Sequence, residues 1–158
     1  MNKIKVYQAE NEPVLGYKKG SKERQNVEKT YNQMFNSKVD VPIYIGGKEI
    51  LTESRKDILP PHDHKNIVGT FSQASEKHVN DAINNLIENK NDWSNTPWER
   101  RCEIFLKAAD LLSKEYRAKI TAGTMIGQSK NIFQAEIDAA CEFIDFLRFN
   151  VSYLTEIY

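Results

Sequence analysis

The second half of the chain is helical in pattern throughout, and this constrains the fold more than any other feature. Apolar residues recur there every three or four positions, which places them on one side of a helix. One such helix starts near Ser75 and carries a stripe that ends at Ile87. Thr96-Pro97 begins a second long helix, and Gly127 is expected to end a third in the left-handed conformation. The sequence therefore predicts a mainly α fold.

The last predicted helix, from about Ser129 to the end, is apolar on more than one side. Its main stripe consists of Ile137, Ala140, Cys141, Ile144, Leu147, Val151 and Leu154. Four phenylalanines add bulk on other faces, namely Phe133, Phe143, Phe146 and Phe149. The helix reaches Ile157-Tyr158 without a glycine, a proline or a cationic cap. We therefore expect packing partners on several sides and a chain truncated from a longer protein.

The first half of the chain predicts irregular and β structure. Ser21 is expected to cap a short helix. Residues 39–51 are expected to form a small antiparallel β-hairpin with Gly46-Gly47 in its turn, because glycine adopts positive φ readily. A further short strand is expected at residues 67–71. The chain is thus predicted to form three segments: 1–38, irregular with a short helix; 39–72, hairpin and short strand; and 73–158, helical.

The composition excludes several classes of protein. The 22 basic residues equal the 22 acidic ones, so no net charge attracts the chain to nucleic acid or to anionic membranes. No apolar run approaches the roughly 20 residues that span a bilayer. The first residues match neither a secretory signal nor a transit peptide, and the two cysteines form no disulfide framework. We therefore expect a cytoplasmic location.

Histidines and cysteines could carry chemistry, but each has a simpler structural explanation. His62-Asp63-His64 offers metal-ligand types, yet no further ligand stands at a useful spacing, so a solvated turn is favoured. Cys102 and Cys141 each belong to an apolar helical stripe and lack a histidine base nearby in the sequence. Both are expected to be packing residues.

An acidic row occupies one side of the last helix. Asp138, Glu142 and Asp145 recur at helical spacing, and Phe146 and Phe149 flank the same side. One interpretation is a solvated face. The other is a cavity border, where a carboxylate framed by aromatic rings meets an ammonium group.

Several stretches of the sequence identify a protein family more specifically than these patterns do. They are Asn11-Glu12-Pro13-Val14-Leu15, Gly20-Ser21 with Glu23-Arg24, residues 104–112, 124–130 and 133–140, and then Glu142 and residues 144–150. In this order they resemble the opening part of the Δ1-pyrroline-5-carboxylate dehydrogenase (L-glutamate γ-semialdehyde dehydrogenase) family, a branch of the aldehyde dehydrogenase superfamily. The resemblance covers residues 11–158.

The resemblance implies a fold and an activity for a longer parent protein. The chain would be the N-terminal segment of the α/β aldehyde dehydrogenase fold, without its Rossmann-like cofactor core. The parent would be a homo-oligomeric, NAD-dependent oxidoreductase that converts L-glutamate γ-semialdehyde to L-glutamate in proline catabolism. A cysteine thiolate attacks the aldehyde in this family, hydride passes to NAD, and water releases the acid.

The resemblance assigns few residues of this chain to that reaction. The family's nucleophile, general base, oxyanion asparagine and cofactor turn lie beyond residue 158, so the chain alone is expected to be inactive. No catalytic, cofactor-binding or metal-binding residue is assigned here. A glutamate bordering the family's aldehyde tunnel aligns with Glu142, which is therefore expected to be adjacent to the substrate, while Asp138 and Asp145 are expected to be structural. The alternative is a freestanding helical protein-interaction module, which a stop codon directly after codon 158 would favour.

Overall fold

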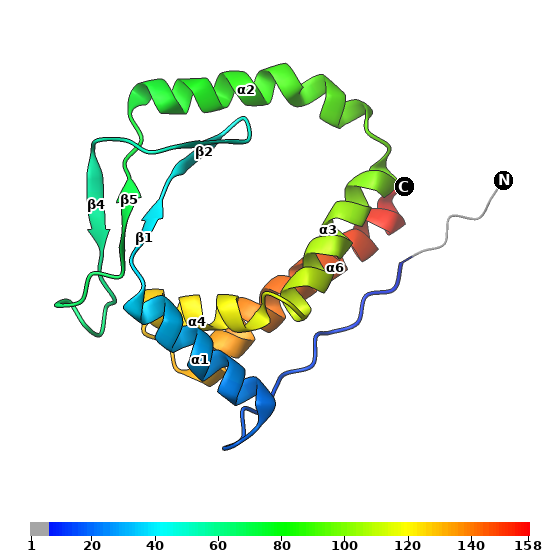
Figure 1. Ribbon diagram of the computed structural model, residues 1–158. Coiled ribbons are helices and arrows are strands. Elements are labelled where there is room, and N and C mark those ends of the chain that lie inside the picture. The colour runs from blue at the N-terminus through cyan, green and yellow to red at the C-terminus, as the bar shows by residue number, and fades with distance from the viewer. Residues whose placement is uncertain (1–6) are drawn as a thin grey trace. The chain divides into compact units, whose positions relative to one another are not determined.

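The computed structural model describes residues 7–158, and helices make up most of it, which confirms the mainly α prediction (Figure 1). Contacts between elements divide the chain into two compact units. The first contains the residues up to Asn32 together with Trp98–Tyr158, and the second contains Gln33–Pro97. The three sequential segments expected above stay a prediction.

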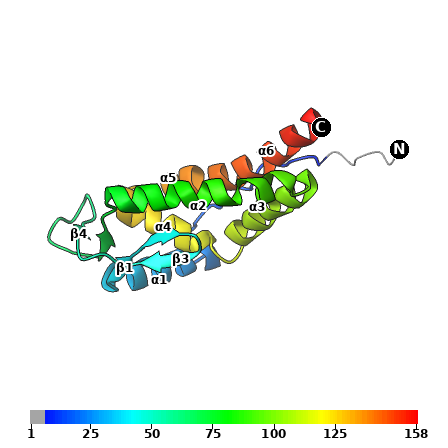
Figure 2. The same ribbon diagram turned by 90° about the horizontal axis from the view of Figure 1, so that it is seen from above.

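The first unit is built from helices and an extended segment. Its helices are α1 (Lys22–Asn36), which continues a few residues into the second unit, α3 (Trp98–Ser113), α4 (Arg117–Gln128), α5 (Ile132–Ala135), η1 (Glu136–Cys141) and α6 (Glu142–Ile157). The last three follow one another without leaving right-handed helical geometry, and α5 and α6 lie along one line in Figure 2. Helix α3 packs along α6 (Figure 1).

The ends of these helices follow local capping chemistry. The Ser21 hydroxyl accepts a hydrogen bond from the Arg24 amide at 3.4 Å, which confirms the predicted cap of α1. The prediction that Gly127 ends α4 in the left-handed conformation was wrong. Helix α4 continues to Gln128, and Ser129 takes the left-handed conformation with φ 55°.

The last helical stretch begins later than expected and contains an irregularity. Asn131 caps α5 through a reciprocal pair of hydrogen bonds with Gln134, so the helix starts at residue 132. The six residues of η1 form a π-helix, in which hydrogen bonds span five residues and one extra residue is inserted. All later residues are therefore shifted in register relative to a regular α-helix.

Small side chains let the helices of the first unit approach closely. Ala122, Ala135 and Ala140 are completely buried where α4 meets the α5–η1 stretch. Ile144 and Val151 continue this buried face along α6, as the apolar stripe predicted. Close packing of this kind leaves little room for larger side chains at the alanines.

The second unit contains two small sheets. Strands β2 (Ile43–Ile45) and β3 (Lys48–Ile50) form the predicted antiparallel hairpin, with Gly46 and Gly47 at φ 56° and 74° in its turn. A separate three-stranded sheet has the order β1-β5-β4. Its strands are β1 (Val39–Val41), β4 (Arg55–Ile58) and β5 (Gly69–Ser72).

The three-stranded sheet corrects the expectation that residues 39–72 contain one hairpin and one strand. Strand β1 is not part of the hairpin but pairs with β5 in parallel, and β4, unexpected from its charged sequence, pairs with β5 antiparallel. Gly69 lies against the backbone carbonyl of Val39, where a Cβ atom would collide. Glycine is thus required for this close pairing of β1 and β5.

Helix α2 (Glu76–Asn95) completes the second unit. It starts where predicted, and Ser75 caps it through a reciprocal arrangement with His78. Its apolar stripe is exposed, however, by 47–70% at Val79, Ile83, Leu86 and Ile87.

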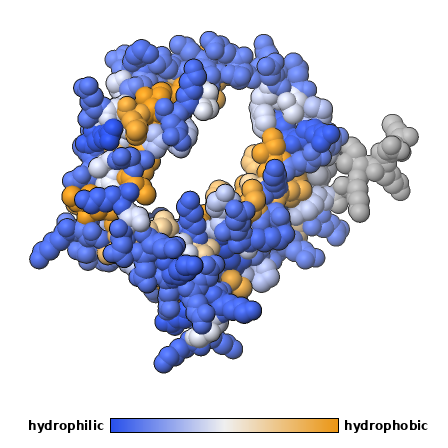
Figure 3. Space-filling view, in the orientation of Figure 1, coloured by the Kyte–Doolittle hydropathy of each residue, from blue (hydrophilic) through white to orange (hydrophobic). Residues whose placement is uncertain are grey.

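Figure 3 shows further hydrophobic residues at the surface of α3, where Ile104 and Phe105 are exposed. None of the helices in residues 7–158 combines the length and the apolar character needed to cross a membrane.

Candidate functional site

A pocket of about 580 Å³ lies in the first unit, between α6 and an extended segment. We call this segment, residues 11–17, the strap. The strap contributes Asn11, Glu12 and Val14 to the lining, and the helix contributes Glu142, Phe146 and Phe149 among others. The lining is mostly apolar, with a few polar groups at its border, as is typical of small-molecule sites.

Glu142 lies at the start of α6 and lines this pocket. Phe146 and Phe149 follow it at spacings of four and seven residues, which places all three on one face of the helix. Glu142 is exposed, and among residues 7–158 no hydrogen bond or ion pair involves its carboxylate. Of the two interpretations of the acidic row, the geometry therefore favours a cavity border at Glu142.

The other two members of the acidic row have partners. Asp138 forms an ion pair with Lys130 at 2.6 Å and does not line the pocket. Asp145 does line it, but both of its carboxylate oxygens accept hydrogen bonds from the strap, from Asn11 Nδ2 at 2.7 Å and from the Glu12 amide at 2.6 Å. The three acidic side chains, similar in sequence, thus have different environments.

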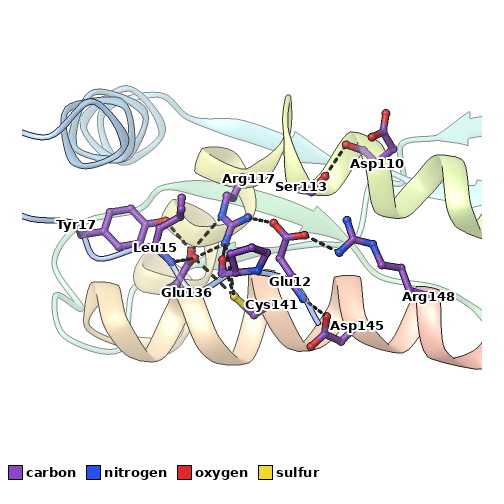
Figure 4. A network of polar contacts seen from close by, with 11 residues as sticks. Glu12, Leu15, Tyr17, Asp110, Ser113, Arg117, Glu136, Cys141, Asp145 and Arg148 are labelled. Atoms are coloured by element: carbon purple, nitrogen blue, oxygen red, sulfur yellow. Dashed lines mark hydrogen bonds and ion pairs between the residues drawn. The ribbon is translucent and has the colours of Figure 1, made fainter. Parts of the chain in front are cut away.

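A buried network of charges holds the strap in place (Figure 4). Glu136, on η1, is completely buried. Its carboxylate accepts hydrogen bonds from the Leu15 amide at 2.9 Å and from the Tyr17 hydroxyl at 2.6 Å, and it forms an ion pair with Arg117 of α4. A buried carboxylate needs such partners to remain ionised.

Glu12 connects this network to α6. Its carboxylate lies between two guanidinium groups in Figure 4, forming ion pairs with Arg117 and, at 2.7 Å, with Arg148. Arg117 also donates to the Pro13 carbonyl at 2.8 Å. The strap is therefore held by side chains from α4, η1 and α6 rather than by regular backbone pairing.

The pKa values follow from burial and from these contacts. Burial alone would raise the pKa of Glu136, but hydrogen bonds from Arg117, Tyr17 and the Leu15 amide outweigh it and hold the pKa below the usual value. Burial alone would lower the pKa of Arg117, but hydrogen bonds to Glu136 and Glu12 leave it raised. Burial and the hydrogen bond to Glu136 raise the pKa of Tyr17. All three groups thus keep their ordinary charge states near neutral pH.

The two cysteines lie in environments that disfavour the thiolate. Burial raises the pKa of the Cys102 thiol. Cys141 borders the pocket, but burial and the nearby Glu136 carboxylate, 3.6 Å from its sulfur, raise its pKa to about 11. Because the thiolate is the nucleophile, neither residue is suited to attack an aldehyde near neutral pH.

The histidines do not form part of the pocket. His62 stacks on Phe35 with ring centroids 6.1 Å apart, within the second unit. Over the described residues, no three His, Cys, Asp or Glu side chains gather closely enough to hold a metal ion. Of the site residues considered from sequence, the structure brings Glu142 and Asp145 to the pocket together with Cys141.

Sequence reasoning missed Glu12, Tyr17, Arg117, Glu136 and Arg148, which together hold the strap. They carry no periodic signal, because their contacts connect positions more than a hundred residues apart as well as positions in neighbouring helices. Three of them, Glu12, Glu136 and Arg148, do lie inside strings that carry the family resemblance.

Comparison with known proteins gives a consistent result. A family model described as "Aldehyde dehydrogenase family" matches residues 51–158. The mitochondrial delta-1-pyrroline-5-carboxylate dehydrogenase of Dictyostelium discoideum is 45% identical over 148 residues, which are 94% of this chain and 26% of that protein. The human enzyme of the same name is 40% identical over 147 residues, covering 93% of this chain and 26% of that protein.

Solved structures agree with the sequence relatives. The Delta-pyrroline-5-carboxylate dehydrogenase from Mycobacterium tuberculosis bound with NAD superposes with a TM-score of 0.95 at 40% identity. The match covers 99% of this chain and 30% of that one. The chain thus has the architecture of part of the aldehyde dehydrogenase fold, and it spans about a quarter of the length of the curated relatives.

Proposed function

Because the chain belongs to the aldehyde dehydrogenase family, we propose that it is part of an NAD-dependent enzyme that oxidises L-glutamate γ-semialdehyde to L-glutamate in proline catabolism. The semialdehyde is the open form of Δ1-pyrroline-5-carboxylate. One observation carries this proposal: relatives 40–45% identical over nearly the whole chain are named as dehydrogenases of this compound. The similar M. tuberculosis enzyme was solved bound with NAD, which supports the choice of cofactor.

The pocket is chemically suited to this substrate. Glutamate semialdehyde carries an ammonium group near one end and an aldehyde at the other. Glu142 offers a carboxylate that has no partner in residues 7–158, and Phe146 and Phe149 beside it are able to cover the aliphatic part of the molecule. A charge-assisted hydrogen bond from the ammonium group to Glu142 would orient the substrate.

The chain's own residues have a limited part in this reaction. The described residues include no glycine-rich turn between a parallel strand and a helix, so we assign no contact with NAD to them. Together with the raised thiol pKa values of Cys102 and Cys141, this supports the proposal that the chain frames the substrate pocket but does not catalyse the oxidation alone. Several relatives are named mitochondrial, while the cytoplasmic location and the homo-oligomeric parent expected from sequence stay predictions.

The experiment for this proposal uses the protein encoded by the complete reading frame that contains the chain. It should reduce one NAD for each L-glutamate formed from glutamate semialdehyde, measured by NADH absorbance and amino-acid analysis. The isolated 158-residue chain should give no turnover under the same conditions. Absence of glutamate formation by the complete protein would contradict the proposed reaction, and turnover by the isolated chain would contradict its inactivity.

Glu142→Gln in the complete protein tests the proposed substrate contact. The substitution keeps the shape of the side chain but removes its charge, so KM for glutamate semialdehyde should rise about tenfold. A short aliphatic aldehyde lacks the ammonium group, and its kinetics should change little. Asp138→Asn is the matched control, because Asp138 belongs to the same acidic row but pairs with Lys130 away from the pocket. Equal effects of Glu142→Gln on both aldehydes would return Glu142 to the role of a solvated surface residue.

A further inference from the structure

One wall of the pocket is the strap, which is extended and not helical. An extended segment at the surface has no backbone ladder of its own, so its position depends on the groups that hold it. The Glu12 carboxylate is turned to Arg117 and Arg148. The strap therefore presents the Asn11 amide and the Val14 side chain to the pocket as neutral groups.

Asp145 holds the part of the strap that borders the pocket. It follows Glu142 by three residues and so lies on the same side of α6. One carboxylate oxygen accepts from Asn11 Nδ2 and the other from the Glu12 amide, at 2.7 and 2.6 Å. The carboxylate of Glu142 makes no comparable contact in the described chain. Of the two acidic groups on this side of the pocket, Asp145 is thus occupied by the protein itself.

We propose that Asp145 is a positioning residue for substrate selectivity, which it controls by holding Asn11 and Glu12 at the border of the pocket; this rests on the proposed oxidation of glutamate semialdehyde. A long polar aldehyde contacts both the helix and the strap, whereas a short aliphatic aldehyde is too small to need the strap. Displacing the strap therefore affects the two substrates differently. Asp145 acts through the strap and does not itself bind the substrate.

An exchange of the two side chains tests this in the complete protein. Asn11→Asp places two carboxylates against each other and pushes the strap away from α6. Asp145→Asn keeps an acceptor for the Glu12 amide, and the Asn11 side chain is able to turn over and accept from the new amide group. The double variant restores both hydrogen bonds, because the amide introduced on α6 accepts from the Glu12 backbone through its oxygen and donates to the carboxylate introduced on the strap through its nitrogen.

The readout is the ratio of kcat/KM for glutamate semialdehyde to kcat/KM for propanal. This ratio does not depend on the folded fraction, so a loss of stability alone leaves it unchanged. Loss of the hydrogen bonds between Asp145 and the strap in Asn11→Asp should lower the ratio about fivefold, and the double variant should restore it. Asp145→Asn alone should leave it within about twofold of the unsubstituted protein.

Three results would overturn the inference. An unchanged ratio in Asn11→Asp would show that the strap has no influence on selectivity. A lower ratio for Asp145→Asn, both alone and combined with Asn11→Asp, would show that Asp145 contacts the substrate directly. If the unsubstituted protein forms no glutamate from the semialdehyde, the proposed function fails and this inference fails with it. If it does form glutamate, an unchanged ratio in Asn11→Asp contradicts this inference alone, so the two failures are distinguishable.

Discussion

Among the individual residues, Glu136 holds the strap through several contacts. Its buried carboxylate receives hydrogen bonds from two strap residues, Leu15 and Tyr17, and pairs with Arg117. Replacing one member of a buried ion network leaves the others with an uncompensated charge, which destabilises more than the contact itself contributes. We therefore expect the stability of the protein to be sensitive to replacement of Glu136.

Glu136→Gln should destabilise the complete protein by about 3 kcal/mol, because Arg117 loses one of its two buried carboxylate partners. The measurement is the apparent Tm by circular dichroism. Glu103→Gln, which removes an exposed partner of Arg100, should leave the Tm unchanged. Equal Tm values for Glu136→Gln and Glu103→Gln would contradict a structural role for the network.

The stability contribution of Glu136 should also depend on pH. Its pKa is lower in the folded protein than in the unfolded chain, so its stabilising effect is fully present above the unfolded value of about 4.5. The effect should disappear as the pH falls through the lower, folded pKa. The difference in Tm between the unsubstituted protein and Glu136→Gln should therefore shrink below about pH 4.5. A difference that stays constant down to about pH 2 would be incompatible with a depressed pKa at Glu136.

Among the helices and strands, local chemistry predicted most of the helices. Ser21 caps a helix where expected, a helix starts near Ser75 as expected, and Gly46-Gly47 forms the turn of the hairpin. The sequence could not reveal β4, since Arg55–Ile58 is mostly charged and has no alternation. Nor could it reveal that β1 pairs with β5, because parallel pairing of distant strands is non-local.

The π-helix is a second element without a local signal. Its residues, Glu136–Cys141, include the good helix formers Glu136, Ala139 and Ala140, and nothing in their order requires the inserted residue. The insertion matters because Glu136 at its start is buried in the network, and Glu142 directly after it lines the pocket. π-Helical turns are frequently found at functional sites. The resemblance to the family, and not the periodicity of the sequence, identified Glu142. The contacts that hold the strap became apparent only from the structure.

Alanine substitution is expected to have opposite effects on stability at two glycines. Gly69→Ala should lower the apparent Tm of the complete protein, because the added methyl group collides with the backbone of Val39 and forces β1 and β5 apart. A cost of about 2 kcal/mol is expected from overpacking. Gly127→Ala is the matched control: it lies inside α4 with open space around its Cβ position, so it should be neutral or stabilising by about 0.5–1 kcal/mol. A Tm for Gly69→Ala at or above that of Gly127→Ala would contradict the close pairing.

In the molecule as a whole, the proposed function assigns substrate binding and the chemical step to different parts of the complete protein. The first unit supplies a pocket with a carboxylate, aromatic side chains and a clamped strap. The apolar surfaces left exposed on α2 and α3 are consistent with a chain that spans about a quarter of the length of its relatives. Composition and periodicity alone indicated a helical domain without an assignable reaction. The stretches of sequence that resemble the family indicated the reaction.

The residues of this chain thus frame the pocket, and we expect the reacting thiol elsewhere in the complete protein. Alkylation of that protein with iodoacetamide, followed by peptide mass spectrometry, locates this thiol. The loss of activity should track the modification of a cysteine outside residues 1–158, with Cys102 and Cys141 unmodified because they are buried and have raised thiol pKa values. Inactivation that instead tracks alkylation of Cys102 or Cys141 would place the nucleophile within this chain and refute the division of roles.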